Sequence, residues 1–160
     1  MPVRTGDATG RVWLFDTHET TEREVYLLLQ HVAGAQVQEL AVLLRPAGIT
    51  PEQYHVLRVL RDAGAGGLAC NAVAERSVSG DPDVTRLLDR LERQGWVSRA
   101  REEYDRRVVT ARITDEGHRL LEELEEPVSA LHARQLERLG ERDLPALRRL
   151  LQKVADARPA

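Results

Sequence analysis

The chain has 160 residues, a length typical of one domain with or without helical extensions. Apolar residues make up 42% of the sequence and charged residues 31%, so the chain can bury a core and stay soluble, and no run of consecutive apolar residues is long enough to predict a membrane-spanning helix. The formal net charge of −3 argues against a uniformly basic nucleic-acid-binding surface, but residues 84–112 hold eight arginines against five acidic residues.

The N-terminal part is predicted to consist of a loose arm and one long helix. Residues 1–20 show no clean periodicity. From Thr21, apolar residues recur at three- and four-residue steps, which indicates an amphipathic helix that Pro46 and Gly48 end. A helix of about 25 residues is long for a domain of this size. We therefore expect it to pack against more than its own chain.

Three shorter helices are predicted next. Thr50 and the proline after it form a typical helix start, and that helix ends at the glycine cluster 64–67. A short helix is expected over residues 68–76, followed by a turn at 77–80. The third helix is expected over residues 81–94, closed by Gly95, with four apolar residues on one face. These are Val84, Leu87, Leu88 and Leu91.

The apolar periodicity then changes from 3.6 residues to two, which indicates a β-hairpin. Residues 96–101 and 107–113 are the predicted strands, with a polar turn between them. Another helix is expected to start at residues 114–117, and Pro127 should kink or restart it. The last helix is expected from about Glu141.

A helix-turn-helix followed by a two-stranded hairpin suits DNA binding, because the second helix fits a major groove about 12 Å wide. Here that helix carries Arg86, Arg90 and Arg93 at helical spacing, an arrangement suited to phosphates or a guanine. Arginines at the hairpin tip are placed to enter a minor groove. The alternative is that the helix arginines form a solvated face paired with Asp89 and Glu92.

Three segments in this order resemble the winged-helix core of MarR-type bacterial transcription regulators: GITPEQYHVLRVL, VTRLLDRLERQGWVSRA and REEYDRRVVTARITDEGHRLL. The resemblance is specific over about residues 48–122. It implies a mainly α fold, α+β by its wing, in which a winged helix-turn-helix core with a two-stranded β-hairpin is flanked by long N- and C-terminal helices that form a dimerisation layer. The expected parts are the arm 1–20, a dimerisation helix 21–47, a DNA-binding lobe 48–114 and C-terminal dimerisation helices 115–160.

The resemblance also implies a function. The protein would be a ligand-responsive repressor without cofactors or catalysis that binds a pseudo-palindromic operator in double-stranded DNA as a homodimer. The family's recognition-helix contacts fall on Pro82, Asp83, Thr85 and Arg86, and helical spacing adds Arg90. The family's wing arginine falls on Arg106 or Arg107, which Asp105 would orient by a charge-assisted hydrogen bond.

The acidic residues that open the recognition helix depart from the family pattern and leave the operator sequence open. Asp81 is expected to cap the helix, whereas Asp83 either accepts a hydrogen bond from a cytosine or has no base contact.

The resemblance also implies an effector site between the dimerisation layer and the lobe. The residues expected to line it are Trp13, His31, Tyr54 and His55, and the expected ligand is a small aromatic or phenolic molecule. The equal alternative is that Tyr54 and His55 only pack a helix junction.

Two other functions compete with this one. The low local charge and the acidic start of the recognition helix would suit a dimeric winged-helix protein-interaction module that does not bind DNA. A thiol-redox-switched regulator would use Cys70, but a sensing thiol needs access and a depressed pKa, and we expect Cys70 to be buried apolar filler.

The remaining sequence features favour no other class of site, and metal sensing would require histidines that cluster only in the fold. One cysteine cannot form an intramolecular disulfide, and the five histidines show no metal-ligand pair on one helix face. The first residues lack the apolar core of a secretory signal, so we expect a cytoplasmic protein without a membrane partner.

Overall fold

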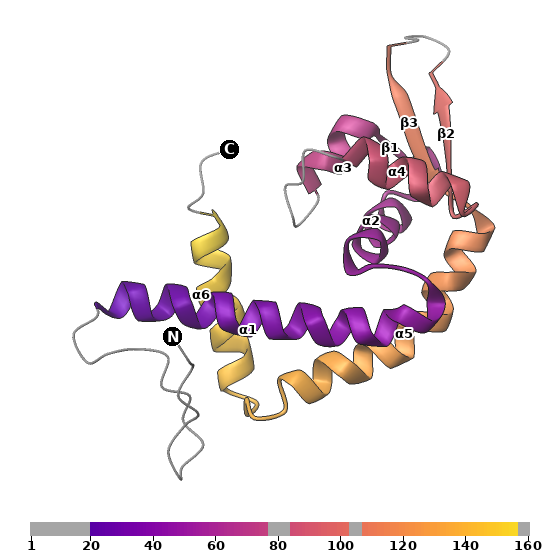
Figure 1. Ribbon diagram of the computed structural model, residues 1–160. Helices are drawn as coiled ribbons and strands as arrows, with labels where there is room; N and C mark the ends of the chain where they lie inside the picture. The colour runs from indigo at the N-terminus through magenta and orange to yellow at the C-terminus, as the bar shows by residue number, and fades with distance from the viewer. Residues whose placement is uncertain (1–19, 77–83, 103–106, 157–160) are drawn as a thin grey trace, which may run out of the picture. The chain divides into compact units, whose positions relative to one another are not determined.

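A computed structural model of the chain describes residues 20–76, 84–102 and 107–156, and those residues form helices and one small sheet. The chain divides into two compact units, Met1–Val42 and Leu43–Ala160. The elements in chain order are α1 (Thr21–Leu44), α2 (Pro51–Asp62), β1 (Leu68–Ala69), α3 (Cys70–Arg76), α4 (Val84–Arg93), β2 (Val97–Arg101), β3 (Val109–Ile113), α5 (Asp115–Gln135) and α6 (Asp143–Asp156) (Figure 1). This order confirms the predicted winged helix-turn-helix with helical flanks.

Helix α1 begins and ends close to the predicted residues. The backbone N–H of Glu24 donates to the carbonyl of Thr20 at 3.1 Å in its first turn. A 3₁₀ turn, Arg45–Ala47, extends the helix to Gly48, whose φ of 69° lies in the left-handed region that glycine adopts readily.

The apolar side chains of α1 are largely exposed, with exposed fractions from 39% to 61% at seven positions. These are Val25, Tyr26, Leu28, Leu29, Val32, Val37 and Val42. By length and composition alone, Thr21–Ala47 is apolar enough to cross a membrane, with a mean hydropathy of 1.3. The segment has no uninterrupted apolar run of the length that a membrane span needs, and only its average hydropathy is high. One helix of this kind is weak evidence for a membrane protein, since a helix that packs on another protein has the same composition.

The sheet is antiparallel with strand order β1-β3-β2. Strand β3 pairs with β2 from Val97 opposite Ile113 to Arg101 opposite Val109, and it pairs with β1 through Leu68 opposite Ala111. The hairpin is thus confirmed, although its second strand begins two residues later than predicted. The prediction of helix at residues 68–69 was wrong, because these residues pair with β3 instead.

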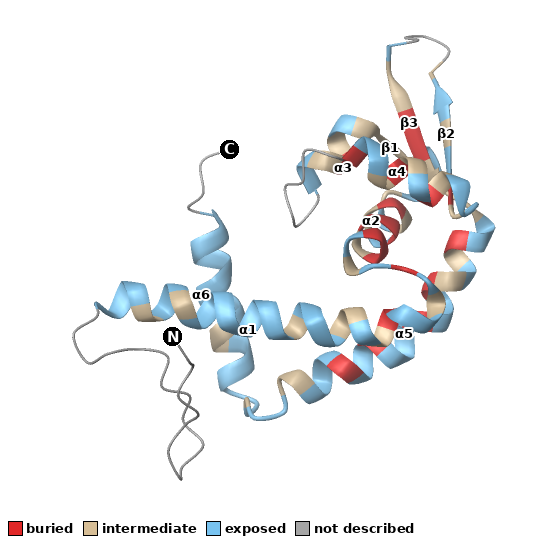
Figure 2. Ribbon diagram, in the orientation of Figure 1, coloured by how far each residue is buried: buried red, intermediate tan, exposed pale blue. Residues whose placement is uncertain are grey.

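The core of the second unit lies where α2, α3 and α4 meet the sheet, as the buried positions in Figure 2 show. The predicted apolar face of α4 supplies three of its side chains, and Leu87 at the edge of that face is half-buried. Fully buried side chains at this junction are Val56, Leu57, Leu60, Val73, Leu88 and Leu91. Helix α2 has the predicted start, with a capping box in which the Thr50 hydroxyl oxygen accepts from the Gln53 N–H at 3.3 Å and the Gln53 side chain accepts from the Thr50 N–H at 3.0 Å.

Hydrogen bonds join the base of the hairpin to α5. The backbone N–H of Thr114 donates to the carbonyl of Trp96 at 3.0 Å, and the Thr114 hydroxyl donates to the carbonyl of Gly95 at 2.7 Å. The same hydroxyl oxygen accepts from the Gly117 N–H at 3.1 Å and so caps α5. Thr114 therefore sets the direction in which α5 leaves the sheet.

Helix α5 continues through Pro127 without restarting. Proline removes one backbone donor, but Pro127 is exposed, so water can satisfy the carbonyl left without its partner. The buried side chains of Leu124 and Val128 on either side hold the helix together by packing. The helix therefore does not restart at Pro127, and the other expectation, a kink at this residue, stays a prediction. Helix α6 begins at Asp143, two residues later than predicted.

Candidate nucleic-acid interface

Helix α4 separates an apolar face from a basic one. Val84, Leu88 and Leu91 are buried, in agreement with the predicted spacing. The exposed positions of the helix include Thr85, Arg86, Arg90 and Arg93. Since successive residues of a helix are rotated by about 100°, the arginines point away from the core. The residues assigned to DNA contact on this helix are thus accessible wherever the structure describes them.

The acidic residues of α4 are bound by an arginine of the neighbouring strand. The Arg99 Nη2 lies 2.5 Å from the Asp89 Oδ1 and 2.6 Å from the Glu92 Oε2. Both acids thus form an ion pair with Arg99 of β2, whereas the alternative pairs them with the arginines of their own helix; that alternative stays a prediction. The hydrogen bond to Glu92 is the largest cause that raises the pKa of Arg99 above its ordinary value, and the hydrogen bond to Asp89 raises it further. Arg99 is therefore a permanent cation.

Sequence reasoning missed Arg99 as a residue of this region. Arg99 lies in the predicted strand. The spacing of apolar residues predicts helices and strands, but it does not predict which charged side chains lie close together in the fold. One signal was available: helix α4 and strand β2 are joined by a tight turn at Gly95, which brings residues on the two sides of that turn close together. Arg99 and Glu92 are seven residues apart across it.

The stem of the wing is held by its own polar side chains. The backbone N–H of Glu102 donates to the Val108 carbonyl at 3.1 Å, and the Arg112 Nη2 lies 3.2 Å from the Glu102 Oε1. A hydrogen bond from Thr110, together with one from Arg112, lowers the pKa of the Glu102 carboxyl. Arg107 is exposed where the chain enters β3. Hydrogen bonds and an ion pair therefore join strands β2 and β3 next to Arg107, the residue predicted to contact DNA.

Several assigned residues lie outside the described part of the chain. These are Trp13, Asp81, Pro82, Asp83, Asp105 and Arg106. Their assignments remain predictions.

The residues assigned to an effector lie in different surroundings. His31 is exposed on α1. Tyr54 is 7% exposed and belongs to the core of the lobe. The Nε2 of His55 lies 3.2 Å from the carbonyl oxygen of Arg76, where α3 ends. These contacts of Tyr54 and His55 favour their interpretation as packing residues.

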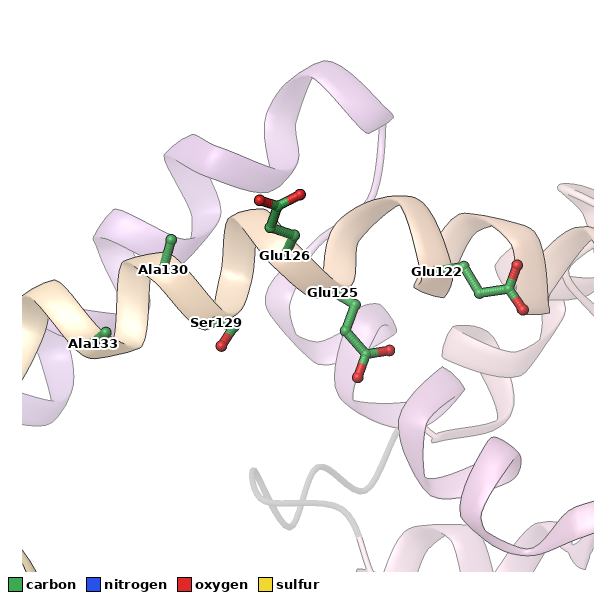
Figure 3. A pocket seen from close by; sticks show the side chains of 6 residues that line it. All are labelled: Glu122, Glu125, Glu126, Ser129, Ala130 and Ala133. Atoms are coloured by element: carbon green, nitrogen blue, oxygen red, sulfur yellow. The ribbon is translucent and has the colours of Figure 1, made fainter.

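A surface hollow lies along α5 (Figure 3), lined by Glu122, Glu125, Glu126, Ser129, Ala130 and Ala133. All six side chains come from one helix, and a single helix cannot enclose a small molecule. Of the residues assigned to the effector, the three that the structure describes, His31, Tyr54 and His55, do not line this hollow. Within the described ranges, no group of three or more histidine, cysteine or acidic residues is placed to hold a metal ion.

Cys70 is half-buried at the start of α3. Its pKa is raised by burial, and the positive charge of Arg99 opposes this only in part. The thiol is therefore protonated at neutral pH. A protonated thiol reacts slowly with oxidants, which speaks against the redox-switch alternative.

The geometry agrees with the relatives of this sequence. Residues 49–109 match the model of the MarR family. The transcriptional repressor MdtR of Bacillus subtilis is 31% identical over 134 residues, which cover 84% of this chain and 85% of that protein.

Two solved structures resemble this chain in fold as well as in sequence. A mutant of MarR from Escherichia coli complexed with operator DNA is 27% identical, with a TM-score of 0.74 over 85% of this chain and 99% of that one. CouR from Rhodococcus jostii bound to p-coumaroyl-CoA is 28% identical, with a TM-score of 0.73 over 89% of this chain and 99% of that one. The chain belongs to the MarR family of DNA-binding transcription regulators and is not an enzyme.

Proposed function

We propose that the protein is a cytoplasmic, ligand-responsive repressor that binds a pseudo-palindromic operator as a homodimer. The observation that carries the proposal is the basic face of α4: its arginines are exposed, whereas Asp89 and Glu92 are paired with Arg99. A helix of this kind beside a β-hairpin suits a major groove flanked by phosphates. We assign the DNA contacts to Pro82, Asp83, Thr85, Arg86 and Arg90 in the recognition helix, and to Asp105, Arg106 and Arg107 in the wing.

The homodimer is proposed from the apolar surface of the flanking helices. On α6, four large apolar side chains are 41–59% exposed: Leu144, Leu150, Leu151 and Val154. Helix α1 exposes seven more. An isolated protomer would leave this apolar area in water, and a second copy would remove it. We therefore assign residues 21–47 and 115–160 to dimerisation and residues 48–114 to DNA binding.

A small aromatic or phenolic effector is proposed from the relatives. CouR was solved with p-coumaroyl-CoA, whose acyl group is a phenol. We assign Trp13 and His31 to the effector site together with Tyr54 and His55. Because Tyr54 and His55 already pack within the lobe, an effector that reaches them would have to act through the packing of α2.

DNA binding is tested first. The titration uses fluorescence anisotropy with the DNA upstream of the protein's own gene, at low and moderate salt, with unlabelled competitor DNA. A DNA-binding regulator should resist competition and lose affinity log-linearly with salt, because phosphate contacts release counterions. Absence of binding to this DNA and to sequences selected from a random pool would leave the protein-interaction module as the function.

The dimer is tested with a charge on the apolar face of α6. Leu150→Glu should convert the dimer to a monomer in sedimentation equilibrium, because the glutamate would be buried unpaired in the interface. The fold of the protomer should not change, since Leu150 is 55% exposed within it. Arg149→Glu, a charge change about 100° around the same helix from Leu150, is the control and should remain dimeric. A dimer unaffected by Leu150→Glu would contradict the assignment of α6.

A further inference from the structure

One arginine binds two carboxylates where α4 meets the wing. The Arg99 Nη2 contacts the Asp89 Oδ1 at 2.5 Å and the Glu92 Oε2 at 2.6 Å, and the Arg99 Nε donates to the same Glu92 oxygen at 3.0 Å. The backbone N–H of Arg99 donates to the other Glu92 oxygen at 3.2 Å. The strand thus binds Glu92 through both its side chain and its backbone.

The two carboxylates belong to the helix that carries the basic face. Asp89 follows Arg86 by three residues and precedes Arg93 by four, so its side chain is a helical neighbour of both. Glu92 lies on the same flank, nearer to β2. Without Arg99, the helix would present two negative charges beside its three arginines.

Stability alone does not account for this cluster. The side chains of Asp89 and Glu92 are 38% and 39% exposed, and that of Arg99 is 21% exposed. Because these side chains are partly accessible to water, their ion pairs add only modestly to the stability of the fold. In contrast, an unpaired carboxylate on a DNA-facing helix would repel every phosphate within about a Debye length, roughly 8–10 Å.

We propose that Arg99 is a positioning residue for DNA binding: it holds Asp89 and Glu92 toward the wing stem and cancels part of their charge, so that the field of α4 at the DNA is set by its arginines. The inference rests on the proposed assignment of α4 as the DNA-reading helix. The role requires the planar guanidinium, because a lysine would supply one point charge in place of the two nitrogens that reach the carboxylates.

The test compares the affinities with which the wild-type protein and variants lacking one or more of these charges bind one DNA duplex. The probe is a duplex selected by the wild-type protein from a random pool, titrated over a salt series. Arg99→Gln should weaken binding roughly tenfold at low salt and reduce the slope of log affinity against log salt by about 0.9, the effect of one lost effective charge. The triple variant Arg99→Gln/Asp89→Asn/Glu92→Gln should bind at least as tightly as the wild type, because no unpaired carboxylate remains and its net charge is one unit more positive than that of the wild type.

Arg61→Gln is the matched control. Arg61 pairs with Glu125 of α5 at 3.1 Å, away from α4, and its replacement should leave DNA binding unchanged. Thermal melts of every variant by circular dichroism show that the protein used in each titration is folded.

Two results would overturn the inference while leaving the DNA-reading role of α4 in place: Arg99→Gln binding as tightly as the wild type, or the triple variant staying as weak as Arg99→Gln. A wild-type protein that selects no duplex would instead overturn the proposed function, and with it this role for Arg99.

Discussion

The glycine before β1 is a position where one methyl group should destabilise the lobe. Gly67 has a φ of 68° and a ψ of −163°, a conformation that almost only glycine adopts. A Cβ there would collide with the carbonyl oxygen of Ala111 in β3 and would lie 2.6 Å from the Arg112 Cγ and 3.1 Å from the Thr110 Cγ2. The side chain of Arg112 can move, but the backbone of β3 cannot move without disturbing the sheet.

Two effects should lower the free energy of unfolding in Gly67→Ala. The backbone conformation costs about 1–3 kcal/mol for a residue with a Cβ. The collision adds about 1–3 kcal/mol, as for other overpacked sites. The free energy of unfolding should therefore fall by roughly 2–6 kcal/mol, which lowers the melting temperature of a chain this long by about 4–24 °C.

Gly66→Ala is the matched control for this substitution. Gly66 lies one residue earlier, has no positive φ, and a Cβ there would meet nothing within 4 Å. Its replacement should be neutral or stabilise by up to ~1 kcal/mol, because alanine restricts the unfolded chain. Urea unfolding and thermal melts followed by circular dichroism compare the two variants. Equal stabilities would refute the argument that Gly67 is required by the approach of β3.

Three further predictions concern the wing, a helix cap and the thiol. Alanine at both Arg106 and Arg107 should weaken operator binding by about 1–3 kcal/mol in anisotropy titrations with the melting temperature unchanged, and full retention of affinity would disprove the wing assignment. Thr50→Ala should lower the free energy of unfolding by about 1 kcal/mol in urea titrations, because it removes the hydroxyl that caps α2, whereas Thr50→Ser should retain most of the stability. Cys70→Ser should leave both the operator affinity and its response to peroxide unchanged, since burial raises the pKa of the Cys70 thiol; a response that disappears in this variant would favour the redox switch.

The elements whose signals lie within a few residues of one another were predicted well. The start of α2 depends on Thr50 and Gln53, and the start of α5 depends on Thr114 and Gly117; in both cases the cap and the group it binds are three residues apart. The apolar spacing of α4 likewise identified its buried face. Local geometry is encoded in neighbouring residues, so one sequence is enough to read it.

The errors arose where the partner is distant in the sequence. Strand β1 has two residues, too few to show a period of two, and it exists because Ala111 lies opposite Leu68. The continuity of α5 through Pro127 depends on packing on both sides of that residue, which outweighs one lost hydrogen bond.

The sequence by itself determined the order of the helices and of the two hairpin strands, the winged-helix class and the surface positions of the α4 arginines, because periodicity, caps and helix-ending glycines are local. Only the tertiary structure decided which charges meet. It paired Asp89 and Glu92 with Arg99 of β2, and it placed His55 against the carbonyl of Arg76. Such contacts depend on how the chain brings separate elements together, and the electrostatic and hydrogen-bonding energies that follow act over only a few ångströms.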